Sequence, residues 1–178
     1  MTASIEHPVA VQGCLEACRR CRVLVETLGE QEPETARRAY QAIGPQLRHC
    51  LDHFICFVRG LDSGVVDYDA RDRDERVERD PQYFTEQLDA AAQRLQSIDS
   101  GTVRRVLEVR QEVAPGGRAR TVGTNVEREL MFLSSHTIHH IAIMTLLAES
   151  SGVSIRDDLG VAFSTASYME RESTPSAN

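Results

Sequence analysis

Two pairs of histidines in this 178-residue chain have the spacing of metal ligands. His136 and His140 are four residues apart, and so are His49 and His53. Residues four apart on an α-helix lie one turn apart on the same face, so each pair presents two imidazoles in one direction. Imidazole nitrogen binds zinc, nickel, copper and iron. A buried histidine with ordinary hydrogen bonds is the structural alternative, but the occurrence of two such pairs favours a metal site.

The pair His136 and His140 lies within the apolar segment 130–147. Both histidines align with Leu133 at helical spacing, which places them on the face that we expect to be buried. His139 lies about 100° around the helix from His140, because an α-helix has 3.6 residues per turn. We therefore expect His139 to flank the site rather than to bind the ion.

A third ligand is expected from the segment 45–61, where His49 and His53 lie beside the apolar stripe. Their spacing alone does not decide which of the two reaches the site. Two histidines from one helix and one from another give three neutral nitrogen ligands and leave a coordination position for water or substrate. This pattern is typical of catalytic zinc, which lowers the pKa of a bound water or thiol.

Composition limits the classes of function. The chain is 41% hydrophobic and 26% charged, as expected for a globular protein of one domain, and its formal net charge of −7 disfavours binding to nucleic acid. All 20 basic residues are arginine, which excludes a lysine Schiff base. No uninterrupted apolar run approaches the roughly 18–20 residues of a membrane span, and no signal peptide is recognisable. We therefore expect a cytoplasmic protein without a membrane partner.

The five cysteines do not resemble the disulfide framework of a secreted protein. Cys14, Cys18 and Cys21 share one helical seam, with the spacing of a radical-SAM cluster motif. We reject that interpretation because the three residues lie along one helix and the chain is too short for the required barrel. Core packing is the expected role of these thiols. The alternative is soft-metal binding, such as copper(I), with help from Cys50 or Cys56.

Apolar residues at helical spacing predict four long amphipathic helices. The predicted ranges are about 8–28, 45–61, 81–98 and 124–151. A shorter helical piece at 35–43 is expected to end at Gly44-Pro45, because proline suits the first turn of a helix and not its interior. Thr124 and Glu127 are predicted to form a capping box at the start of the last helix.

The segments between the helices differ in character. The charged stretch 62–80 has no apolar period and is predicted to be a solvated loop, in which Tyr68 has a functional role only if it points inward. Alternation over 103–122, around the turn signal Pro115-Gly116-Gly117, predicts a β-hairpin. The sequence thus predicts a mainly α protein, a four-helix bundle with a small β-hairpin between its third and fourth helices. The expected organisation is a tail at 1–7, the bundle at 8–152 and a partly packed C-terminal extension at 153–178.

The chain resembles the DinB-like (DinB/YfiT) metal-binding four-helix bundles over about residues 11–152. The resemblance is carried by Arg48-His49-x-x-Asp52-His53-Phe54, by Val66-Asp67-Tyr68-Asp69-Ala70-Arg71 and by Ser135-His136-x-x-His139-His140. It implies a bundle of the up-down-down-up type that binds a divalent ion, usually zinc or nickel. It also implies one ligand from the second helix and two from the fourth, which here are His49, His136 and His140.

The resemblance also implies a function. Characterised members include thiol S-transferases that use bacillithiol, mycothiol or glutathione, and many members are dimers. We therefore expect a homodimeric, metal-dependent transferase that joins a low-molecular-weight thiol to a small electrophile. His53, His139 and Tyr68 are the candidates for orienting groups or moving protons. The alternatives are a non-enzymatic metal-binding or stress-response protein and, through the cysteine seam, copper(I) handling.

Overall fold

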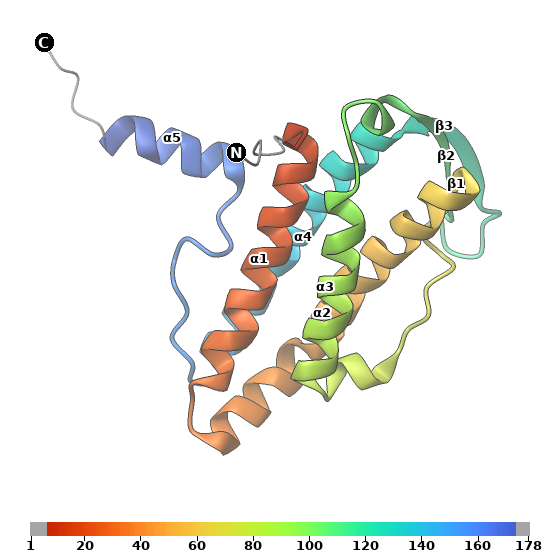
Figure 1. Cartoon of the computed structure of the whole chain (residues 1–178). Helices are drawn as coiled ribbons and strands as arrows, with labels where there is room; N and C mark the ends of the chain where they lie inside the picture. The colour runs from red at the N-terminus through yellow and green to blue at the C-terminus, as the bar shows by residue number, and fades with distance from the viewer. Residues whose placement is uncertain (1–6, 174–178) are drawn as a thin grey trace, which may run out of the picture.

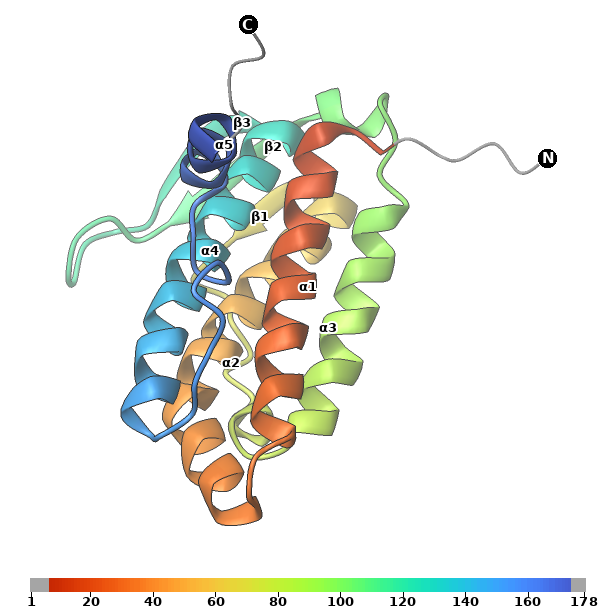
Figure 2. The same ribbon diagram turned by 90° about the vertical axis from the view of Figure 1, so that its left-hand side faces the viewer.

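The computed structural model describes residues 7–173, which are mainly helical with a small three-stranded sheet (Figure 1). Helices α1 to α4 lie side by side, and the sheet lies at one end of them (Figure 2). The helices are α1 (Val9–Gly29), α2 (Pro33–Ser63), α3 (Pro81–Gln96), α4 (Val126–Ser150) and α5 (Phe163–Ser173). Two short 3₁₀ turns are η1 (Glu75–Glu78) and η2 (Thr102–Arg104), and the strands are β1 (Val65–Asp67), β2 (Val106–Gln111) and β3 (Arg120–Asn125).

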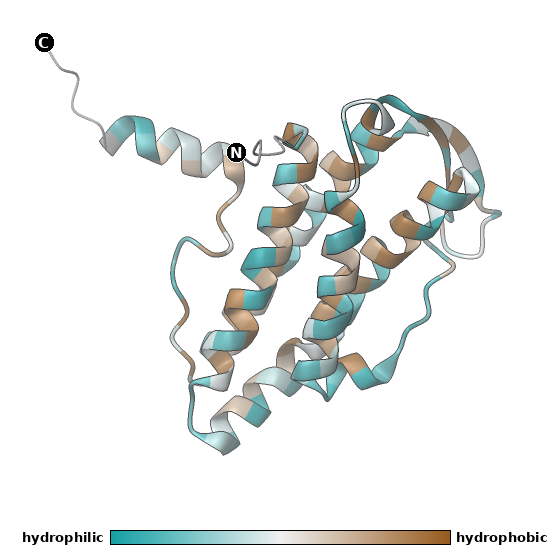
Figure 3. Cartoon of the chain, viewed as in Figure 1, coloured by the Kyte–Doolittle hydropathy of each residue, from teal (hydrophilic) through white to brown (hydrophobic). Residues whose placement is uncertain are grey.

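The core is formed where the apolar faces of α1 to α4 meet. Apolar and polar bands alternate along each of these helices (Figure 3), as expected for amphipathic helices with one buried face. Phe54, Phe57 and Phe84 are fully enclosed in this core. Burial of these large aromatic side chains contributes to the packing of α2 and α3 against their neighbours.

Helix α2 is continuous through Gly44-Pro45, so the predicted break at this point is wrong. Proline in a helix interior costs about 3 kcal/mol, and tertiary packing offsets that cost here. A Cβ atom at Gly44 would lie 2.7 Å from the carbonyl oxygen of Glu78, so glycine allows η1 to pack directly against α2. As a result, His49 and His53 stand on one long helix rather than near the start of a short one.

The predicted hairpin is confirmed as β2 and β3, which pair antiparallel with Val109 opposite Val122. The sequence missed strand β1, which pairs parallel with β2 through Val65 and Glu108. Gly64 has a φ of +85° and ends α2 in the left-handed conformation, so the chain turns directly into β1. The prediction of a solvated loop over 62–80 is therefore wrong at its start, which is fixed in the sheet.

Helix α4 begins with a cap that differs from the predicted capping box. Asn125 is the N-cap, and its side-chain oxygen accepts a hydrogen bond from the backbone N–H of Arg128 at 2.8 Å. The Thr124 hydroxyl instead donates to the carboxylate of Glu129 at 2.6 Å. The predicted pairing of Thr124 with Glu127 is wrong because Asn125 occupies the capping position one residue later.

Helix α4 is, within residues 7–173, the one helix whose length and composition would allow it to cross a membrane. The expectation from uninterrupted apolar runs overlooked it, because polar residues interrupt the segment. One third of its most apolar window is buried inside the structure. The core helix of a soluble protein can have the same composition; α4 packs against α1 and α2, and its residues Leu130, Leu133 and Met144 are buried.

The C-terminal extension is partly packed and contains a helix that the sequence analysis did not predict. Val153, Ile155 and Leu159 are buried before the chain reaches α5. The ring of Phe163, the first residue of α5, lies beneath the Arg20 guanidinium at 5.0 Å. Of the predicted N-terminal tail, only His7 is among the described residues. The last five residues of the predicted C-terminal extension also lie outside them.

The close approach of η1 to α2 predicts that a larger side chain at position 44 destabilises the folded protein. Gly44→Ala should lower the free energy of unfolding by about 1–3 kcal/mol, because the added methyl group would overlap the Glu78 backbone. Gly29→Ala is the control: no atom lies within 4 Å of the added Cβ, and Gly29 is the last residue of α1, so the change should raise stability by less than the about 0.5–1 kcal/mol of a mid-helix position. Urea denaturation measures both changes. Equal stability of the two variants would contradict the packing described here.

Candidate metal centre

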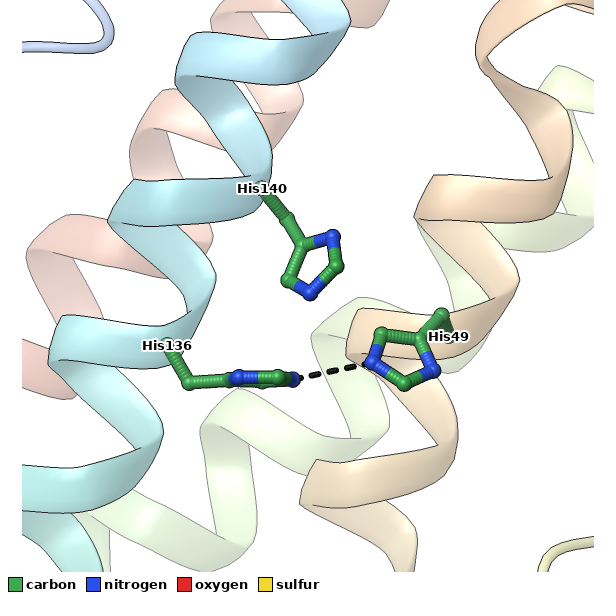
Figure 4. A group of neighbouring side chains, drawn as sticks. All are labelled: His49, His136 and His140. Atoms are coloured by element: carbon green, nitrogen blue, oxygen red, sulfur yellow. Dashed lines mark hydrogen bonds between the residues drawn. The ribbon is translucent and has the colours of Figure 1, made fainter.

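Three imidazoles from two helices meet where α2 packs against α4 (Figure 4). His49 comes from α2, and His136 and His140 come from consecutive turns of α4. One nitrogen of each ring can be chosen so that all three lie within 4.8 Å of one another, and the Nε2 atoms of His49 and His136 are 3.0 Å apart. The group can therefore hold a metal ion, as the sequence analysis expected of imidazoles from two separate segments.

The surroundings keep these histidines neutral. Burial is the largest cause that lowers the pKa of His49 to about 4 and that of His136 to about 3, and the neighbouring imidazoles lower both further. Burial also lowers the pKa of His140. A neutral imidazole has a lone pair on one nitrogen, whereas a protonated ring has none to offer a metal. The group is thus a set of neutral nitrogen donors at pH 7.

His140 is oriented by Gln46, a residue that the sequence analysis did not single out. The Gln46 Oε1 atom accepts a hydrogen bond from His140 Nδ1 at 2.6 Å. The proton of the neutral ring is then on Nδ1, and the lone pair is on Nε2. A partner of this kind is characteristic of metal-binding histidines. The signal in the sequence was the position of Gln46 three residues before His49, one turn away on the same face of α2.

Arg71 contacts His49 and was also missed as an individual residue. It follows β1, and its Nη1 lies 3.1 Å from His49 Nδ1. The Nε atom of Arg71 is buried and has no hydrogen-bond partner. The sequence analysis placed Arg71 in a charged loop, and nothing in that loop's composition distinguishes it from the neighbouring arginines.

His53 lies beside the three-histidine group and not within it. It is 5% exposed, and its Nδ1 donates a hydrogen bond to the His49 carbonyl oxygen at 2.8 Å. Its ring centroid is 4.5 Å from that of His136 and 5.2 Å from that of Tyr68, on which it stacks. Of the two candidates on α2, the structure groups His49 with the histidines of α4, and His53 supports the ring of His136.

Tyr68 points inward, which was the condition that the sequence analysis set for a functional role. It is 3% exposed, and its hydroxyl donates a hydrogen bond to Glu129 Oε2 at 2.8 Å. Glu129 is fully buried and also accepts from Thr124 and Arg128. Sequence reasoning missed Glu129, although its place seven residues before His136 puts it two turns away on the same face of α4.

His139 is exposed and stands at the edge of the group, as expected. Its ring centroid is 5.5 Å from that of His140. It lines a hollow of about 600 Å³ together with His136 and a small set of other side chains. Those other lining residues are Arg128, Met131, Phe132 and Ser135. His136 borders this hollow, whereas His49 and His140 do not line it, and each of the three is only partly exposed.

The cysteines do not form a comparable group. All five are buried free thiols, and within residues 7–173 no cysteine belongs to a group of three or more possible metal ligands that lie close together. Burial raises the pKa of Cys18 to about 12 and also raises those of Cys14 and Cys21. Protonated thiols are poor metal ligands, so these positions favour the expected role in core packing over copper(I) binding.

Comparisons of the chain with protein-family models, with curated proteins and with solved structures found no match.

The lowered pKa values predict a pH dependence of stability. In the unfolded chain these histidines have the ordinary pKa of 6.5, whereas in the folded protein the pKa of His49 is about 4 and that of His136 is about 3. At a pH between these values, the unfolded chain therefore binds protons that the folded protein does not. The contribution of these residues to the free energy of unfolding is therefore constant above about pH 6.5 and falls as the pH drops below it. Urea denaturation of the metal-free protein from pH 7.5 to 4 measures this loss.

His136→Asn should reduce the loss of stability between pH 6.5 and 4, because asparagine does not titrate in that range. The same slope in the variant and in the native protein would show that His136 has an ordinary pKa and is not desolvated as described.

Proposed function

We propose that this protein binds a divalent metal ion through His49, His136 and His140. The observation that carries the proposal is the convergence of three neutral imidazoles from two helices, with their nitrogens within 4.8 Å of one another. In the metal-free protein the ring nitrogens that face one another have only each other as partners, as the 3.0 Å contact between His49 Nε2 and His136 Nε2 illustrates. Imidazole donors suit zinc and nickel, and these are the ions that we propose.

We further propose that the chain is a DinB-like four-helix bundle of the up-down-down-up type. The course of the chain supports this, because α1 and α4 run in one direction and α2 and α3 run in the other (Figure 1). The long crossing from α2 to α3 contains β1 and η1. The ligand positions, one on α2 and two spaced by four on α4, agree with the arrangement that the resemblance implies.

The proposed reaction is the transfer of a low-molecular-weight thiol to a small electrophile. A bound divalent ion would lower the pKa of the thiol toward neutrality. The thiolate sulfur would then form a bond to the electrophilic carbon, and the leaving group would depart with the electron pair of the broken bond. In this proposal His139, which lines the same hollow as His136, would accept the thiol proton and release it to solvent.

His53 and Tyr68 have positioning roles in this proposal. His53 donates its Nδ1 proton to a backbone carbonyl and packs against His136, so it fixes the orientation of a ligand. Tyr68 donates to Glu129, and burial raises its pKa far above the ordinary value, so its hydroxyl stays protonated. A homodimeric state and a cytoplasmic location stay predictions of the sequence.

Metal binding is tested by dialysis against zinc or nickel followed by elemental analysis. The native protein should retain about one ion per chain. His136→Ala should weaken binding by more than about 100-fold, because loss of a ligand's hydrogen-bond partner alone costs about 10–100-fold. His139→Ala is the matched control on the same helix and should retain the ion. Absence of bound metal in the native protein would refute the proposal.

Turnover is tested with the metal-loaded protein, a low-molecular-weight thiol and a fluorogenic alkyl halide. Thiol consumption should stop when a chelator removes the ion and should resume when the ion is restored. Metal binding without any thiol consumption, across bacillithiol, mycothiol and glutathione, would instead favour the non-enzymatic metal-binding function.

A further inference from the structure

Two of the three histidines have opposite kinds of partner on the nitrogen that faces away from the site. His140 Nδ1 faces the Gln46 Oε1 atom, which accepts hydrogen bonds. His49 Nδ1 faces Nη1 of Arg71, and a guanidinium group has only donors. The same ring atom is therefore a donor in His140 and an acceptor in His49.

This difference fixes the tautomer of His49. A neutral imidazole carries one proton, and Nδ1 must be the unprotonated nitrogen if it accepts from Arg71. The proton is then on Nε2, which lies 3.0 Å from His136 Nε2 and donates to it. Consequently, the His49 nitrogen that faces the other two ligands carries hydrogen and has no lone pair for an ion.

We infer that Arg71 is a positioning residue that holds His49 in the tautomer unable to bind metal, and that its release from Nδ1 accompanies metal binding. The inference rests on the proposed metal-binding function. To become a ligand, His49 must carry its proton on Nδ1, where the donor groups of Arg71 would face another N–H. The ring neither gains nor loses a proton in this change, since the proton moves from Nε2 to Nδ1.

The surroundings of Arg71 fit such a release. Its Nε is buried without a hydrogen-bond partner, so the guanidinium is incompletely satisfied where it lies. Residues 72–76, directly after it, are exposed, but Asp72 pairs with Arg59 and the backbone of Arg73 is hydrogen-bonded to Asp52, so the release moves the Arg71 side chain and not the segment. Asp52 lies three residues after His49 on α2 and interacts electrostatically with Arg71, so it offers an acceptor for the released group. Arg71 thereby weakens the site for metal and makes occupancy depend on the position of its own side chain.

The tautomer of His49 is measured directly in the native, metal-free protein. Long-range ¹H–¹⁵N correlation spectra of uniformly ¹⁵N-labelled protein distinguish a protonated Nδ1 from a protonated Nε2. We expect His49 to be protonated on Nε2 and His140 on Nδ1. A His49 ring protonated on Nδ1 would overturn the inference, whether or not the protein binds metal.

The effect on affinity is measured by zinc titration against a competing chelator. Arg71→Gln replaces the donor by a side chain whose oxygen can accept from Nδ1, as Gln46 does for His140, and it should tighten zinc binding by at least about 10-fold. Arg48→Gln is the control for charge. Arg48 also lies near His49 and lowers its pKa, but its guanidinium binds Glu78.

The outcomes separate this inference from the proposed function. Tighter binding in Arg71→Gln than in Arg48→Gln supports the role of Arg71. Equal affinities in the native protein and both variants would overturn that role and leave the metal site intact. Failure of all three folded proteins to bind zinc would overturn the metal site itself.

Discussion

The contact between α2 and α4 is the constraint on which the site depends. Histidines four residues apart can share a face of one helix, but a third ligand requires a second helix at close packing distance. Here α2 contributes His49 and α4 contributes His136 and His140. The continuity of α2 through Pro45 matters for this geometry, because a break at that point would uncouple His49 from the part of α2 that η1 holds in place.

Burial gives these histidines their chemical character, and hydrogen bonds then set which nitrogen is available. Desolvation favours the neutral ring, so protons do not compete for the lone pairs at neutral pH. Gln46 directs the lone pair of His140 into the group, whereas Arg71 directs the proton of His49 there. The three rings are therefore close together but not equally prepared to bind an ion. Second-layer contacts of this kind commonly tune metal affinity.

The sequence predicted the helices and the histidine pairs well because both depend on local periodicity. It failed where tertiary contacts override local preference. The packing of Glu78 against Gly44 keeps α2 helical through Pro45, and the pairing of β1 with β2 orders a segment that has no apolar period. The partners Arg71 and Glu129 were missed for the same reason, since their roles arise from neighbours far away in the sequence. Spacing could not choose between His49 and His53. Which of the two reaches the histidines of α4 depends on how α2 packs against α4, and the sequence does not show this.

The most direct test of this account is an anomalous-scattering map of crystals grown with zinc, collected on both sides of the zinc absorption edge. The account predicts one peak between α2 and α4, about 2.0–2.1 Å from a ring nitrogen of each of His49, His136 and His140. A zinc peak at another place, such as beside the α1 cysteines, would contradict it. Histidine rings that stay hydrogen-bonded to one another while zinc is bound would also contradict it.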